Sequence, residues 1–142
     1  MAAFDTLLFV APVTEAEAIA LDPNEDAMDR WPSAWLKSIG DLELVELWDV
    51  LSEDENEGTL MADLAWSSPD GDVMVMTTPD EFVTAMAELG ESDFSRVAAQ
   101  WHGGELMCHW SKEDIVTILT QLAVLCRKAV TTATPVLQVG SI

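Results

Sequence analysis

Apolar residues recur every three to four positions in several stretches of this chain, which is the spacing of helices that bury one face. The longest stretch, 112–131, is apolar on nearly all sides, and Ser111 can cap its first turn. We therefore expect a central, mostly buried helix there. Shorter helices are predicted over 14–21, 42–52, 78–90 and 92–101, of which 78–90 has the clearest start, Thr-Pro-Asp-Glu.

Other stretches have the short β-branched and apolar composition of strands. Strands are predicted over 4–10, 73–76 and 136–139, whereas 59–66 fits either a strand or a helical turn. A further short helix is expected within 26–39, where Pro32 must interrupt it or lie near a start. Residues 105–110 are expected to be extended.

These elements predict an α+β fold in one compact domain, residues 1–142. We expect several helices, with the long C-terminal helix central and packed on a small mixed or antiparallel sheet. The first residues have no basic n-region, and no apolar stretch is expected to be long enough to span a membrane. The sequence therefore favours a soluble, cytoplasmic protein whose two cysteines are reduced.

Charge adds a strong constraint. The chain has 26 acidic and 6 basic residues, which gives a formal net charge of −20. Residues 1–93 hold 23 of the acids but only two of the bases, Arg30 and Lys37. Such a field repels a polyphosphate and attracts cations, so we expect a basic protein partner and no nucleic acid. A salt-adapted protein with a solvated acidic surface is the alternative that the charge leaves open.

Few residues suggest catalysis or metal binding. His102, Cys108 and His109 fall short of the ligand set that zinc requires, and a structural role is expected for them. Cys108 and His102 could approach each other across the Gly-Gly turn, but no nucleophile motif supports a hydrolase. The acidic loop near Asp54 imitates an EF-hand with its glycine misplaced. We expect no cofactor and no metal.

Trp31 and Trp35 lie four residues apart and near several carboxylates. An exposed aromatic pair of this kind can anchor an Arg or Lys side chain from a partner. Core packing is the more common use of large aromatic residues. The helix predicted over 42–52 has a wholly acidic polar side, followed by an acidic loop. The partner-binding residues predicted on these grounds are Asp26, Asp29, Trp31, Trp35, Glu43, Glu46, Asp49, Glu53, Asp54, Glu55 and Glu57.

From residue 46 onward the chain resembles the YfbM-like family of small, uncharacterised bacterial proteins. The resemblance is carried by Glu-Leu-Trp-Asp-Val-Leu at 46–51, Thr-Pro-Asp-Glu-Phe at 78–82, Ala-Met-Ala-Glu-Leu at 85–89, Asp93-Phe94, and Trp110 before a long helix and a final strand over 135–139. It covers about two thirds of the chain, and the first 40 residues depart from it. The resemblance implies a compact α+β domain with no established catalytic residues.

The small size, the acidity and the lack of a catalytic motif are typical of immunity proteins that inhibit cationic bacterial toxins. We therefore expect a binding protein rather than an enzyme, acting as a monomer or homodimer on a basic partner such as a toxin or nuclease domain. Two alternatives remain open. One is a small enzyme that uses Cys108 and His102, or carboxylates at a cleft, and the other is a salt-adapted housekeeping domain.

Overall fold

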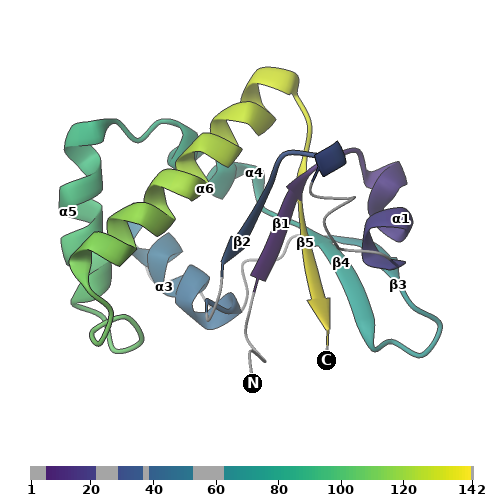
Figure 1. The fold of residues 1–142 in the computed structure, drawn as a ribbon, viewed down its shortest axis with the longest axis horizontal. Coiled ribbons are helices and arrows are strands. Elements are labelled where there is room, and N and C mark those ends of the chain that lie inside the picture. Colours follow the sequence, from purple (N-terminus) through teal and green to yellow (C-terminus); the bar gives the residue numbers. More distant parts are fainter. Residues whose placement is uncertain (1–5, 22–28, 37–38, 53–62, 142) are drawn as a thin grey trace.

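The computed structural model describes residues 6–21, 29–36, 39–52 and 63–141. Its elements follow the order β1 (Thr6–Val10), the 3-10 helix η1 (Val13–Glu15), α1 (Ala16–Leu21), β2 (Ser33–Leu36), α3 (Asp41–Ser52), β3 (Leu64–Ser67), β4 (Val73–Thr77), α4 (Asp80–Ala87), α5 (Glu91–His102), α6 (Lys112–Thr132) and β5 (Val136–Ser141). This arrangement confirms the predicted α+β class (Figure 1).

The strands form a five-stranded sheet in the order β2-β1-β5-β4-β3, and each neighbouring pair is antiparallel. The antiparallel form of the predicted sheet is therefore the correct one. The C-terminal strand β5 occupies the centre, with Leu7 of β1 opposite Val139 on one side and Val75 of β4 opposite Val139 on the other. The sheet thus joins residues from both ends of the chain.

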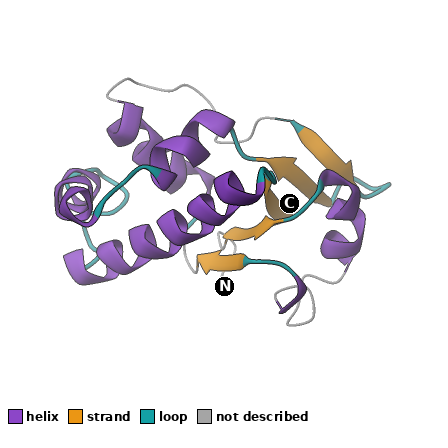
Figure 2. Ribbon diagram, turned by 90° about the horizontal axis from the view of Figure 1, so that it is seen from above, coloured by secondary structure: helices purple, strands orange, loops and turns teal. Residues whose placement is uncertain are grey.

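The two faces of the sheet are buried by different helices. On one face, Leu8, Val10 and Val136 contact the layer formed by α3, α4, α5 and α6. On the other face, Phe9 and Leu137 pack with apolar residues of α1. Figure 2 shows the four helices and α1 on opposite sides of the strands. This alternation along β1 and β5 is the period of two that a pleated sheet imposes.

Helix α6 crosses the larger helical layer, as its apolar sequence predicts. Ser111 caps it by accepting a hydrogen bond from the Asp114 N–H at 3.1 Å. The buried side chains are Ile115, Ile118, Leu119, Leu122, Ala123, Leu125, Cys126 and Ala129. By length and composition α6 could also cross a membrane, so the expectation that no apolar stretch reaches that length is wrong. Core helices of soluble proteins pass the same test, which makes this weak support for a membrane span.

Arg127 connects α6 to the junction between α4 and α5. Its Nε donates to the Ala87 carbonyl at 3.2 Å, and its Nη2 donates to the Leu89 carbonyl. The guanidinium therefore lies at the negative, C-terminal end of α4. The last turn of α6 itself contains no basic residue.

Of the described residues within 26–39, only 29 and 30 are helical, so the predicted helix is confirmed before Pro32 and wrong after it. Residues 33–36 form strand β2, because Ala34 and Leu36 are buried while Trp35 between them is 47% exposed. That alternation has a period of two, and proline at position 32 disfavours continuation of a helix. Residues 105–110 form turns instead of the expected extended segment.

Two predicted helix starts also shift. Thr78 does not cap α4, since Pro79 occupies the cap position and the Thr78 hydroxyl accepts a hydrogen bond from buried Gln138 at 3.0 Å. Helix α5 begins at Glu91, one residue before the predicted Ser92. There the Asp93 carboxylate accepts the Gly90 N–H at 2.9 Å, which lowers the pKa of Asp93, with a smaller contribution from Arg96.

Candidate protein-binding surface

The acidic side of α3 begins with Glu43, which stabilises the start of its own helix. Its carboxylate accepts the Gly40 N–H at 3.0 Å, the contact by which an acid in the first turn satisfies an unpaired helical donor. The Glu43 carbonyl also accepts a hydrogen bond from the Trp101 indole at 3.1 Å. Because Trp101 is fully buried, this bond fixes α3 against α5 and sets the position of the acids that follow.

Glu46 lies against the turn that follows α5. A Cβ atom placed on Gly104 would collide with the Glu46 carboxylate, so a larger residue at position 104 would displace this side chain. The Glu46 carboxylate accepts a hydrogen bond from the Leu106 backbone. Its Oε1 is buried and has no hydrogen-bond partner among the residues described. Glu46 is thus partly enclosed, whereas the sequence had suggested a solvent-facing carboxylate.

Burial raises the pKa of Glu46, and the hydrogen bond from Leu106 opposes that rise. The remaining causes also raise the pKa, and all are repulsions from neighbouring carboxylates, namely Glu105, Glu43 and Asp49. These four residues form what we call the α3 acidic cluster. Three of them were predicted as partner-binding residues. Glu105 was not, because sequence spacing gives no sign that the turn after α5 returns to α3.

The other predicted residues lie elsewhere or outside the described ranges. Trp31 is partly buried and packs against the apolar cluster of the α1 side, which is a structural use. Trp35 lies on edge strand β2 opposite Leu7, and Asp29 is exposed before that strand. The structure thus separates the two tryptophans from the α3 acidic cluster, which belongs to the opposite helical layer. Outside the described residues are Asp26, Glu53, Asp54, Glu55 and Glu57.

A hollow of about 610 Å³ lies between β2 and α6. Pro32, Ala34 and Trp35 line one side, while Val124 and Lys128 line the other. Val124 is 55% exposed, which leaves an apolar strip beside one of the few lysines. A lysine at its rim makes this hollow a poor match for a cationic group, so it does not extend the acidic surface.

The cysteines and histidines do not assemble into a recognisable centre. Cys108 is exposed and its thiol contacts the Glu105 carbonyl at 3.4 Å, while Cys126 is buried in α6. Burial raises the pKa of the Cys126 thiol to about 12, which makes it a poor nucleophile. Within the described ranges, no group of three or more His, Cys, Asp or Glu residues is arranged to hold a metal ion.

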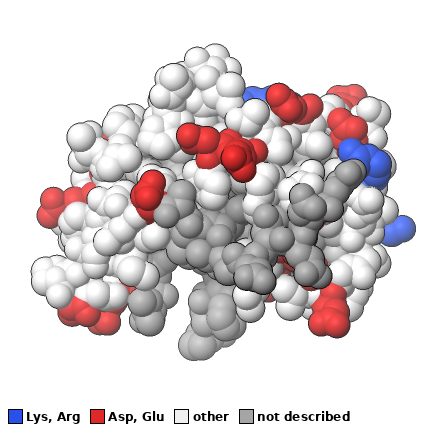
Figure 3. Space-filling model, turned by 180° about the vertical axis from the view of Figure 1, so that it is seen from behind, with Lys and Arg blue, Asp and Glu red and all other residues white. Residues whose placement is uncertain are grey.

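The carboxylates have very few basic partners. Over the described part of the chain, a single ion pair joins a Lys or Arg to an acid, between Arg96 and Asp93 at 3.4 Å on the exposed side of α5. Figure 3 shows Asp and Glu side chains in several separated groups on one face, with Lys and Arg near one edge. The acids seen on this face do not form a single continuous patch.

No protein-family model, curated protein or solved structure matches this chain. The resemblance to the YfbM-like family therefore stays an expectation from sequence motifs. Function has to be argued from the charge and the geometry of the described residues.

Proposed function

We propose that this chain is a small acidic binding protein that neutralises a basic protein partner, in the manner of an immunity protein that inhibits a cationic bacterial toxin. The observation that carries the proposal is the unbalanced charge, −20 in total, with one acid–base pair in the described ranges. Because 26 acids face only 6 bases, most of the negative charge is not neutralised within the chain and attracts an external cation.

The α3 acidic cluster is the part of the described surface best suited to meet such a partner. Glu43 is held in place by a hydrogen bond from the Gly40 N–H, and Glu46 is enclosed against the turn at Gly104, so little side-chain freedom is lost on binding. Glu105 is exposed at the edge of the cluster and can contact the partner directly. The mutual repulsion of these carboxylates would be relieved by a bound Arg or Lys, which favours the complex over the free protein.

The proposal is tested by the rate of association. A partner captured at low ionic strength from the cell of origin would be identified, purified and mixed with the chain over a range of salt concentrations. Because salt screens charges beyond about 8 Å at physiological ionic strength, the association rate should fall steeply as salt rises. Electrostatic steering of this kind raises association rates by about 10-fold to 1,000-fold.

A matched pair of variants distinguishes the effect of charge within the α3 acidic cluster from the effect of the total charge. Glu105→Lys and Asp72→Lys change the net charge equally, and both side chains are exposed, but Asp72 lies in the turn between β3 and β4. Glu105→Lys should slow association several-fold more than Asp72→Lys, with both variants fully folded. A neutral or acidic partner, or an association rate that ignores salt, contradicts the proposed function.

A further inference from the structure

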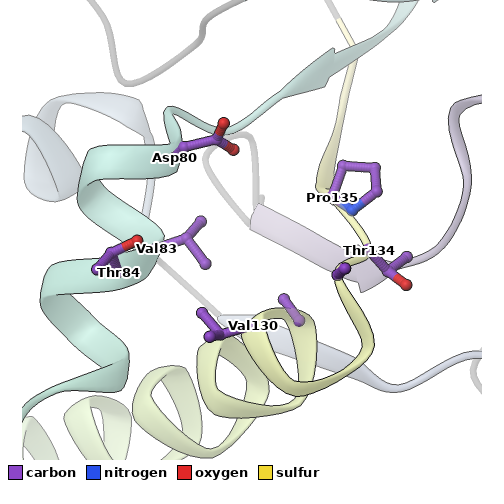
Figure 4. Close-up of a pocket in the computed structure, with 8 residues that line it drawn as sticks. Asp80, Val83, Thr84, Val130, Thr134 and Pro135 are labelled. Atoms are coloured by element: carbon purple, nitrogen blue, oxygen red, sulfur yellow. The ribbon is translucent and has the colours of Figure 1, made fainter.

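A second hollow, of about 500 Å³, lies where the C-terminal end of α6 turns into β5 and faces the start of α4. Figure 4 shows residues of α4 on one side of the gap, and on the other Val130 of α6 with Thr134 and Pro135, which precede β5. Its principal lining residues are Asp80, Val83, Thr84, Val130, Thr134 and Pro135. This pocket shares no residue with the α3 acidic cluster.

The charges at the pocket favour a cation. Helix α6 has 21 residues, and its negative end reaches the pocket without a basic residue in the last turn. Arg127 is already engaged by the carbonyls of Ala87 and Leu89. The exposed Asp80 carboxylate adds a negative charge and has no hydrogen-bond or ion-pair partner among the described side chains. Glu81, a second acid in the first turn of α4, offsets the positive end of that helix.

The rest of the lining is apolar or carries a hydroxyl group. Val83 is buried, Val130 is 51% exposed, and Pro135 closes the side toward β5. The Thr84 and Thr134 side chains add hydroxyl oxygens that can accept hydrogen bonds. A long cationic side chain matches both the apolar lining and the negative charge. Its methylene groups can pack on the apolar surface while its charged end reaches the Asp80 carboxylate. A bare metal ion would leave the apolar lining unused.

We propose that this pocket binds a Lys or Arg side chain, inserted with its methylene groups against Val83, Val130 and Pro135 and its cationic end at Asp80. The inference rests on the proposed function only for the source of that side chain, a basic protein partner. It adds a second, specific contact to the general attraction by the α3 acidic cluster. The acidic field brings the partner near, and the pocket selects where its cation docks.

The experiment titrates the full-length, isotope-labelled chain with n-butylguanidinium, an analogue of the arginine side chain, and follows backbone amide shifts by NMR. The neutral n-butylurea, of nearly the same shape, is the control ligand. We expect saturable shifts within 80–84 and 129–135 for the cation and none for the urea. Asp80→Asn should weaken cation binding about fivefold, the size of one exposed ion pair. Glu88→Gln, at the far end of α4, should leave it unchanged.

Val130→Lys provides a second variant, since it places a tethered ammonium group beside the pocket and should abolish binding of n-butylguanidinium. Equal amide shifts with n-butylguanidinium and n-butylurea would overturn the inference. Shifts confined to the α3 acidic cluster would also overturn it, as would an Asp80→Asn variant that binds n-butylguanidinium as tightly as wild type. Any of these results would leave the salt-dependent association and the effect of Glu105→Lys intact, so the two proposals fail separately.

Discussion

Arg127 offers the sharpest test of how the helical layer is held together. Its guanidinium donates to the Ala87 and Leu89 carbonyls, so Arg127→Ala removes two charge-assisted hydrogen bonds. Each bond of this kind contributes about 1.5–3 kcal/mol when well buried. Arg127 is largely exposed, so the lower value applies and solvent screening reduces it further. We expect Arg127→Ala to reduce the free energy of unfolding by about 2 kcal/mol.

Lys128→Ala is the matched control, because Lys128 is the adjacent exposed base on α6 and its removal changes the net charge equally. We expect it to cost less than about 0.5 kcal/mol. Urea unfolding measures both variants, and with a slope of about 2 kcal/mol per molar the Arg127 midpoint should fall by about 1 M. Arg127→Lys should give an intermediate loss, since lysine keeps the charge without the planar fork. Equal losses for Arg127→Ala and Lys128→Ala would refute the reasoning.

Three further predictions concern single groups. Burial raises the pKa of Glu46 above its ordinary value of 4.5, so its ionised form destabilises the folded state at neutral pH. Glu46→Gln should therefore raise the melting temperature at pH 7. This gain should vanish below about pH 4.5, where Glu46 is protonated in both the folded and the unfolded state. A thiol-reactive dye should label Cys108 in the native protein and reach Cys126 only after unfolding, as mass spectrometry of peptides can verify. Ala133 adopts φ 51°, a left-handed conformation that glycine adopts without strain. Ala133→Gly should therefore raise the free energy of unfolding, measured in urea, by about 0.5 kcal/mol. A lower free energy of unfolding would show that the backbone entropy of glycine outweighs the relieved strain.

Local chemistry allowed most helices and strands to be predicted. The apolar stretch 112–131 and its cap at Ser111 predicted α6, and the apolar run before the C-terminus predicted β5. Both signals arise from neighbouring residues, so sequence spacing captures them. Strand β2 was missed because four residues are too few to reveal a period of two, and its partner β1 lies more than twenty residues away.

The candidate site was predicted less completely, for the same physical reason. The acids of α3 were identified from their spacing on one helix, but the partial burial of Glu46 depends on Gly104, which is 58 residues further along the chain. The sequence signal at His102-Gly103-Gly104 indicated only a break in the chain. The pocket beside Asp80 depends likewise on α4 and the end of α6 coming together, and no local pattern encodes that contact.

Glu46 is the residue at which stability and charge conflict most directly. A glutamine would have nearly the same shape against Gly104 and could still accept the Leu106 hydrogen bond. Packing therefore does not require the negative charge, which burial and three neighbouring carboxylates disfavour. No ion pair to a base compensates the Glu46 charge among the described residues. A charge that disfavours folding in this way is expected at a binding surface whose partner supplies the compensating base. If so, a basic partner should stabilise wild type more than Glu46→Gln, and thermal unfolding with and without the partner measures that difference.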